Sequence, residues 1–143
     1  MPAELEPRAL MRAQPTAALG TTMGGAPYVS LVLVSFDADG SPLLLLSRLA
    51  QHTQNLLADP RVSLLFDGTA GLEEPLTGPR LTVLGSAAPY PDARAMDRYL
   101  ARHPSAAAYA GFSDFDLYKV GIDRGHLVAG FGRIRWVEAA ALL

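Results

Sequence analysis

The sequence predicts a mainly β domain, with five or six mostly antiparallel strands and two or three helices outside the sheet. Short apolar runs rich in β-branched and aromatic residues recur along the 143-residue chain. Turns rich in Gly, Asp and Pro separate these runs. The helical segments do not alternate regularly with the strands, as they would in a doubly wound fold. No repeat, low-complexity tract or second domain is indicated.

Composition excludes several classes of protein. Half of the residues are hydrophobic and 18% are charged, which excludes a disordered chain. The net charge of −2 predicts no general attraction to nucleic acid or to an anionic membrane. Without cysteine, the chain has no disulfides, thiolate metal sites or cysteine nucleophiles. The first twelve residues do not resemble a signal peptide and no apolar run approaches the roughly 20 residues of a membrane span, so we expect a cytoplasmic protein.

In the first half of the chain, the clearest strand is a run of β-branched and aromatic residues after Gly24-Gly25. A turn from Asp37 to Pro42 follows it, so this strand and the next are expected to form a hairpin. The predicted elements here are a helix at Glu4–Ala13, a strand or loop at Thr16–Thr22, strands at Tyr28–Phe36 and Leu43–Ser47, and a helix at Leu49–Ala58 stopped by Pro60.

The second half predicts further strands, with Asp92 as the N-cap of a helix. The expected elements are strands at Arg61–Asp67 and Arg80–Ser86 around a loop at Gly68–Pro79, a helix closed by His103-Pro104, a helical segment at Ala106–Phe112, and strands at Phe115–Ile122 and His126–Val137 joined around Asp123-Arg124-Gly125.

One candidate anion site lies where the strand ending at Ser47 gives way to a helix. Free N–H groups and the positive end of the dipole at a helix start attract anions. Hydroxyl, imidazole, amide and guanidinium donors cluster there, as a phosphate monoester requires; they are Ser47, Arg48, His52, Thr53 and Asn55. The alternative for Ser47 and Thr53 is helix capping, and a single histidine is more often a surface residue.

Two further candidates are basic. Arg80 begins a strand after a flexible loop, where it either faces a cleft or is a solvated edge residue. Near the C-terminus, Arg133 and Arg135 fall on one face of a strand interrupted by Gly130 and Gly132, which indicates a bulge or a close approach. Trp136 either stacks on a ring or interface, or packs in the core.

Several familiar sites are missing from the sequence. It contains no dinucleotide-binding glycine motif, Walker loop or nucleophile elbow. His52, His103 and His126 lack metal-ligand spacing, and Asp114 and Asp116 have no obvious partner carboxylate. Hydrolysis and a metal centre are therefore not expected.

Seven longer motifs follow one another along nearly the whole chain. They are Pro27–Val32, Leu45–Leu56, Asp59–Leu65, Gly78–Thr82, Arg98–Pro104, Tyr109–Phe112 and Gly130–Arg133. Together they resemble the haem-utilisation branch of pyridoxamine 5′-phosphate oxidase-related FMN-binding proteins.

This resemblance implies a six-stranded split barrel that dimerises with two FMN molecules at the interface. It places the flavin phosphate near Ser47, His52, Thr53 and Asn55, which match the family motif, whereas Arg48 lies at a variable position. The remaining implied cofactor contacts are Arg80 near the flavin, the backbone of Tyr28, Val29, Ser30 and Leu31 beside the isoalloxazine, and Arg133, Arg135 and Trp136 from the partner subunit.

The sequence specifies the function of the protein less closely than its fold. A flavin-dependent oxidoreductase acting on a small molecule is the leading hypothesis. The alternatives are a haem-binding or haem-degrading protein and a non-catalytic FMN module, with a deazaflavin in place of FMN as a further option. Longer relatives carry a C-terminal domain that we do not find before Leu143, and we do not find the substrate-binding signature of a true pyridoxamine-phosphate oxidase.

Overall fold

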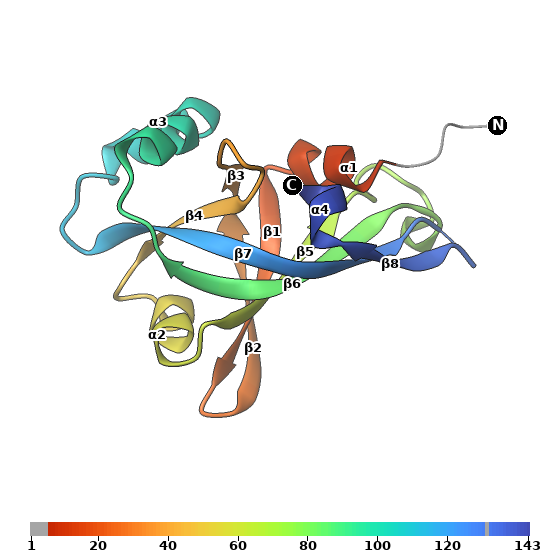
Figure 1. The fold of residues 1–143 in the computed structure, drawn as a ribbon, viewed down its shortest axis with the longest axis horizontal. Coiled ribbons are helices and arrows are strands. Elements are labelled where there is room, and N and C mark those ends of the chain that lie inside the picture. Colours follow the sequence, from red (N-terminus) through yellow and green to blue (C-terminus); the bar gives the residue numbers. More distant parts are fainter. Residues whose placement is uncertain (1–5, 131) are drawn as a thin grey trace.

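The fold is a strongly curled antiparallel sheet with helices at its margins (Figure 1). The computed structural model describes residues 6–130 and 132–143. Its elements are α1 (Pro7–Ala13), β1 (Thr16–Met23), β2 (Ala26–Leu33), β3 (Ser35–Phe36), β4 (Pro42–Ser47), α2 (Gln51–Ala58), β5 (Arg61–Asp67), β6 (Arg80–Pro89), α3 (Ala93–Arg102), β7 (Phe115–Val128), β8 (Ile134–Glu138) and α4 (Ala139–Leu142), with 3₁₀ turns at Pro75–Thr77 and Pro104–Ala108.

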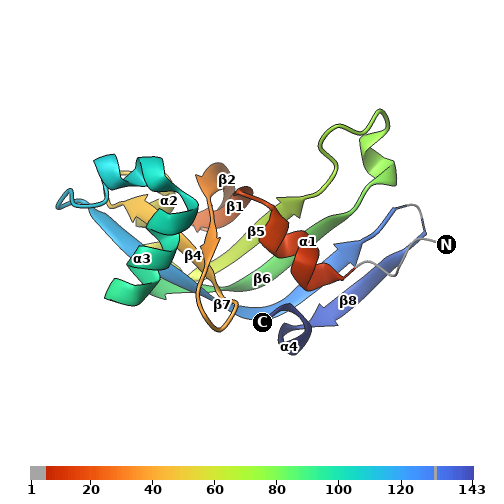
Figure 2. The same ribbon diagram turned by 90° about the horizontal axis from the view of Figure 1, so that it is seen from above.

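Within the described residues, eight strands form one sheet in the order β2-β1-β5-β6-β7-β4-β3, and β8 pairs with β7. The expected mainly β split barrel is therefore confirmed, with more strands than the six predicted. α3 lies at one end of the molecule and the β7–β8 hairpin at the other (Figures 1 and 2). β2 and β4 are close but unpaired, so the barrel stays open between them.

The two faces of the sheet are distinguished by alternation along each strand. Leu19, Leu64, Leu81 and Leu127 are fully buried on what we call the inner face. α1, α2 and α4 pack against this face and add four residues to its core cluster, namely Leu10, Met11, Leu56 and Leu142. The opposite, outer face is covered by α3 only over β4 and the start of β7.

The hairpin predicted between Tyr28–Phe36 and Leu43–Ser47 is largely wrong. The first strand is divided, and its long part, β2, pairs with β1 over eight residue pairs. Only β3 pairs with β4, through Ser35 and Phe36. The division occurs at buried Val34, whose N–H donates to the carbonyl of Pro15 and whose carbonyl contacts the His103 ring. These two bonds remove Val34 from either strand ladder.

The turn predicted at Asp123-Arg124-Gly125 is also wrong. Leu84 pairs with Arg124 and Gly85 with Ile122, so Asp123 is an extra residue in a continuous β7. This irregularity is a β-bulge, which shares its Asp and Gly composition with turns. The actual turn lies between β7 and β8, and Arg133 precedes β8 rather than lying within a strand. Phe131, part of the Gly130–Arg133 motif, lies outside the described residues.

The other helices and strands agree with the sequence within a few residues. Asp92 caps α3 as predicted, because its side chain accepts a 2.9 Å hydrogen bond from the Ala95 N–H. We expect Asp92→Ala to lower the free energy of unfolding by about 1 kcal/mol. Urea denaturation measures the effect, with the exposed Asp97 of the same helix as control. A loss no larger than that of Asp97→Ala would contradict the capping role.

Candidate functional site

The opening between β2 and β4 holds a groove of about 320 Å³. β2 ends the sheet, so one of its edges carries backbone N–H and C=O groups that no other strand pairs. The groove runs from this strand to the end of β4 and the start of α2. It is lined by Leu31, Val32, Leu33, Leu45, Leu46, Ser47, Ala50, His52, Tyr99, Tyr109 and Phe115.

The start of α2 offers the groove unpaired donors. Its N-cap residue is Ala50, which makes no side-chain capping bond. The N–H groups of the first turn, from Gln51 to Thr53, therefore have no partner within the helix. Together with the helix dipole they favour an anion at this end of the groove.

His52 lines the same end of the groove. Its Nδ1 lies 2.9 Å from Ser30 Oγ, which joins α2 to β2. Partial burial lowers the pKa of His52 below its usual range. The imidazole is therefore neutral at pH 7, and one of its nitrogens remains a hydrogen-bond donor.

The lowered pKa of His52 predicts a pH dependence of stability. The unfolded chain binds a proton to His52 more readily than the folded one, so stability is full above the unfolded pKa near 6.5 and falls as the pH drops below it. We expect His52→Gln to remove part of this decline between about pH 7 and 5.5. Urea midpoints measured across this range test the expectation. An unchanged slope in the variant would contradict it.

Ser47 and Arg48 are engaged with acidic neighbours. Ser47 Oγ donates to Asp114 Oδ2 at 2.6 Å and accepts from the Leu49 N–H at 3.1 Å. This second bond lies in the turn before α2, so Ser47 is not the N-cap of the helix. Arg48 forms an ion pair with Asp116 and also donates to the Ser113 carbonyl. Because the Asp114 carboxylate would repel it, a phosphate at this end of the groove would lie close to His52 and the helix N–H groups and away from Asp114.

Thr53 and Asn55 point from α2 into the protein. Thr53 is 0% exposed, and its hydroxyl has no hydrogen-bond partner among the described residues. The Asn55 amide donates to Thr21 Oγ1 at 3.1 Å and accepts from Gln51 at 2.7 Å, which fixes α2 on β1. Neither side chain lines the groove.

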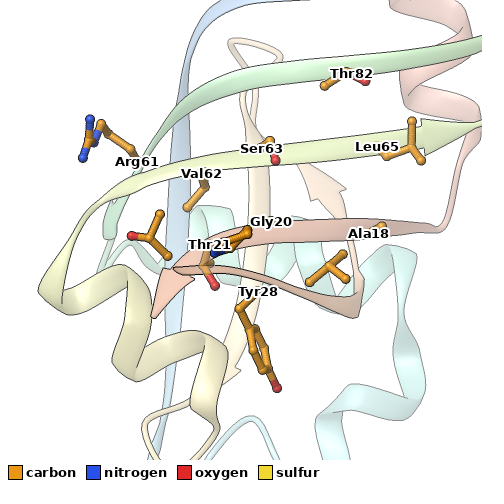
Figure 3. A pocket seen from close by; sticks show the side chains of 12 residues that line it. Ala18, Gly20, Thr21, Tyr28, Arg61, Val62, Ser63, Leu65 and Thr82 are labelled. Atoms are coloured by element: carbon orange, nitrogen blue, oxygen red, sulfur yellow. The ribbon is translucent and has the colours of Figure 1, made fainter. Parts of the chain in front are cut away.

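A second, largely apolar groove of about 700 Å³ lies along the outer face (Figure 3). Gly20 on β1, Ser63 on β5 and Thr82 on β6 belong to its lining, and β2 contributes Tyr28 and Val29. Val29 and Leu31 are alternate residues of β2, so they share a face and bring the two grooves next to each other.

Apolar side chains are exposed over much of this outer face. The register brings Leu31 and Leu65 to either side of Ala18, since Ala18 pairs with both. It also brings Trp136 beside His126. Leu31 is 75% and Ile134 61% exposed. An apolar area of this kind is typical of an interaction surface. Its large members are Val29, Leu31, Leu65, Ile134 and Trp136.

The basic candidates lie at the other end of the sheet. Ser47 pairs with Phe115 at the start of β7, whereas Arg80 pairs with Val128 at its end. The separation is thirteen residues, or roughly 40 Å at the usual rise. Arg80 donates to the carbonyls of Leu76 and Gly78. One protomer therefore does not bring Arg80 to the α2 groove.

The C-terminal candidates share that distant end. Trp136 is 54% exposed on the outer face, which contradicts the core alternative. Its ring packs 4.5 Å from the His126 ring, and the Arg124 guanidinium lies 4.1 Å from its centroid. Arg135 is exposed on the opposite face of β8, and Arg133 is exposed at the turn.

Sequence reasoning missed the aromatic wall of the α2 groove. Tyr99 comes from α3, whereas Tyr109 and Phe115 stack with ring centroids 4.8 Å apart. Burial raises the pKa of Tyr99 far above its usual range, so its hydroxyl stays protonated. No spacing in the sequence marks these residues, because three different segments bring them together.

A family model described as pyridoxamine 5′-phosphate oxidase matches residues 4–129 of the chain. The chain belongs to this family. The match covers every element that builds the α2 groove, and the family resemblance of the sequence is thereby confirmed. β8 and α4 lie beyond the matched residues.

Two of the similar proteins are named for haem. The chain is 41% identical over 99 residues to the chloroplastic heme oxygenase HOZ of Arabidopsis thaliana, covering 67% of this chain and 30% of that protein. A heme binding protein from Mycobacterium smegmatis aligns with a TM-score of 0.87 and 27% identity over 99% of this chain and 61% of the other. The chain thus spans under two thirds of the length of either protein.

A second solved structure supports the fold alone. HutZ, the heme storage protein from Vibrio cholerae, aligns with a TM-score of 0.72 and 22% identity over 93% of this chain and all of that one. In the part of the chain that the structure describes, no helix is both long and apolar enough to cross a membrane. Residues 6–130 and 132–143 contain no cluster of potential metal ligands.

Proposed function

We propose that the chain is an FMN-binding flavoprotein that acts as a homodimer, and that it is an oxidoreductase for a small molecule. The observation that carries the proposal is the uncapped start of α2, which opens into a groove at the free edge of β2. Membership of the pyridoxamine 5′-phosphate oxidase family supports FMN as the ligand.

The α2 end of the groove fits a phosphate. Backbone N–H groups of the first helical turn are free, and His52 supplies a ring N–H once its tautomer donates into the groove. Anion binding would also raise the depressed pKa of His52, since an opposite charge favours the imidazolium. Asp114, which accepts a hydrogen bond from Ser47, would repel a phosphate and so limits it to the His52 side of the groove.

The flavin ring fits the adjoining apolar surface. From His52 the ligand can continue along β2, past Leu31 and Val29, into the larger outer-face groove. Most side chains there are small or apolar, with Tyr28 and Arg61 as the exceptions, and the free edge of β2 supplies backbone donors and acceptors for a polar ring edge. This arrangement agrees with the contact that the family resemblance implies for Tyr28 to Leu31.

A second copy would complete the site. Covering the outer face would bury its exposed apolar residues, as a stable dimer interface requires. A twofold arrangement can also bring the distant end of one sheet to the groove of the other. Arg133 and Arg135 make no ion pair among the described residues, so they are available as positive charges for a partner's phosphate.

When bound, FMN supplies the redox chemistry, and the protein binds, orients and shields it. Here His52 and the α2 N–H groups would hold the phosphate, and β2 would fix the ring edge. Tyr99, Tyr109 and Phe115 would exclude water from one side of the groove. Neither groove contains a carboxylate among its lining residues.

The absorbance spectrum of freshly purified protein and a titration with FMN test this proposal. We expect a flavin spectrum, or saturable binding of one FMN per chain, and bleaching by a suitable reductant. A protein that binds FMN tightly but shows no turnover with NADH, NADPH or a reduced deazaflavin would instead be a non-catalytic flavin module. Failure to bind FMN at all would refute the assignment.

Haem is the second candidate ligand, because HOZ and the Mycobacterium smegmatis protein are both named for it. The three histidines differ in what their rings already contact, and so in which of them would be free to hold haem iron. His103 is buried and bonds the Val34 carbonyl, and His52 bonds Ser30, whereas the ring of His126 makes no hydrogen bond within the described residues. A Soret band on haem titration that His126→Ala abolishes would support haem binding. A band unaffected by this variant would exclude His126 as the ligand.

A further inference from the structure

A separate pocket of about 510 Å³ lies between the end of α1, β3 and α3. α3 separates it from the α2 groove, since Tyr99 lines the groove whereas Arg98 and Arg102 line this pocket. Arg12 enters from the last turn of α1. Ser35 is only 3% exposed and still belongs to the lining, so it lies at the base.

Three arginines therefore line one cavity. Arg98 and Arg102 are one helical turn apart on α3, a spacing that puts their Cβ atoms about 5–6 Å apart. Arg12 joins them from a segment more than eighty residues away in the sequence. Like charges at this spacing destabilise a helix, so the fold concentrates positive charge here at a cost.

Two of the guanidinium groups are held in place by backbone carbonyls. Arg102 donates through Nη2 to the carbonyls of Arg12 at 2.8 Å and Gln14 at 2.9 Å, and its Cζ lies 5.5 Å from the centre of the Phe36 ring. Arg98 donates through Nε to the Phe36 carbonyl at 3.4 Å. These bonds orient the side chains and leave most of the five N–H donors of each guanidinium available.

The pocket holds little negative charge to balance the three arginines. In the described residues, none of these three arginines forms an ion pair. The one carboxylate in the lining, Asp37, is bound 2.8 Å from Lys119 Nζ. Lys119 Nζ also lies 3.1 Å from Asp39 Oδ2, so this one cation is shared by two carboxylates, against three arginines in the lining. The pocket thus carries a local excess of positive charge in a chain whose net charge is −2.

We infer that this pocket binds a small organic phosphate with at least two anionic groups. Guanidinium groups bind phosphate oxygens through paired N–H donors, and two groups spaced one helical turn apart suit two neighbouring anionic groups better than one. Phe36 and the Arg102 plane provide a flat surface for the body of such a ligand. The inference does not depend on flavin binding, because the two cavities share no lining residue.

Isothermal titration of the full chain with inorganic pyrophosphate tests the inference, at constant ionic strength and with saturating FMN present. We expect one saturable site per chain, with pyrophosphate bound more tightly than inorganic phosphate. Arg98→Gln should weaken pyrophosphate binding about tenfold or more, as expected when hydrogen bonds to a charged group are lost. Arg94→Gln is the matched control, because it removes the same charge from an exposed position of α3 outside the pocket.

Binding that survives FMN and His52→Ala but falls in Arg98→Gln would confirm the site. Competition between pyrophosphate and FMN would overturn it, since the anion would then occupy the α2 groove. Equal losses in Arg98→Gln and Arg94→Gln would also overturn it, because they would reflect net charge alone. So would the absence of saturable binding.

Discussion

Ile134→Glu is expected to break the proposed dimer into monomers and, with that, to abolish the proposed tight binding of FMN. Ile134 is exposed on the outer face of β8, so the isolated protomer should tolerate the charge. In a twofold interface the residue occurs twice, and each unpaired buried charge costs about 3–5 kcal/mol. Such a penalty would dissociate even a nanomolar dimer at micromolar concentrations.

The position of Ile134 makes this result specific. It pairs with Val128 at the end of β7, thirteen residues from Phe115, which lines the α2 groove. Ile134 lines neither groove, so we expect a loss of FMN binding in this variant to arise through the partner. Leu57→Glu is the control, because Leu57 is half-exposed on α2 and lines neither groove. Sedimentation and FMN titration of both variants decide the point, and a monomeric variant with unchanged FMN affinity would contradict a shared site.

His52→Ala is expected to weaken FMN binding much more than riboflavin binding. The variant removes a hydrogen bond to a charged phosphate, worth about 1.5–3 kcal/mol, or roughly 10- to 150-fold in the dissociation constant. Riboflavin lacks the phosphate and should lose far less. Fluorescence titrations with both ligands measure the ratio directly.

Two further variants sharpen the His52 result. Gln54→Ala, on the exposed side of α2, should leave both affinities unchanged. Ser47→Ala should have a smaller effect than His52→Ala, because the Ser47 hydroxyl donates to Asp114. If His52→Ala weakens both ligands equally, the phosphate does not bind at the start of α2.

Local patterns in the sequence were sufficient to predict most elements. β5 agrees at both ends with the predicted Arg61–Asp67, and Asp92 caps its helix, because these features depend on neighbouring residues. Strand pairing, by contrast, does not depend on neighbouring residues alone. The long strand starting near Tyr28 was assigned to β4 as the nearest partner, yet the structure pairs it with β1. Choosing between these partners requires knowledge of which faces the core buries.

The strand-to-helix junction predicted after Ser47 is present in the structure, and a groove lies beside it. That a phosphate binds at this junction stays a prediction. The sequence could not tell which way each side chain of α2 points, so His52, which lines the groove, was grouped with the inward-facing Thr53 and Asn55. Tyr99 and Tyr109 escaped notice because distant segments fold them into the wall. The roles of Arg133 and Arg135 stay predictions, since one protomer does not contain their proposed target.

The central claim is that FMN binds at the opening between β2 and β4 in a site completed by a second copy. Sedimentation velocity of the protein mixed with limiting FMN, recorded in both the protein and the flavin absorbance bands, tests it most directly. We predict that the flavin sediments with the dimer at up to one FMN per chain. Flavin that sediments with a monomer, or remains free while the protein sediments alone, would contradict the claim.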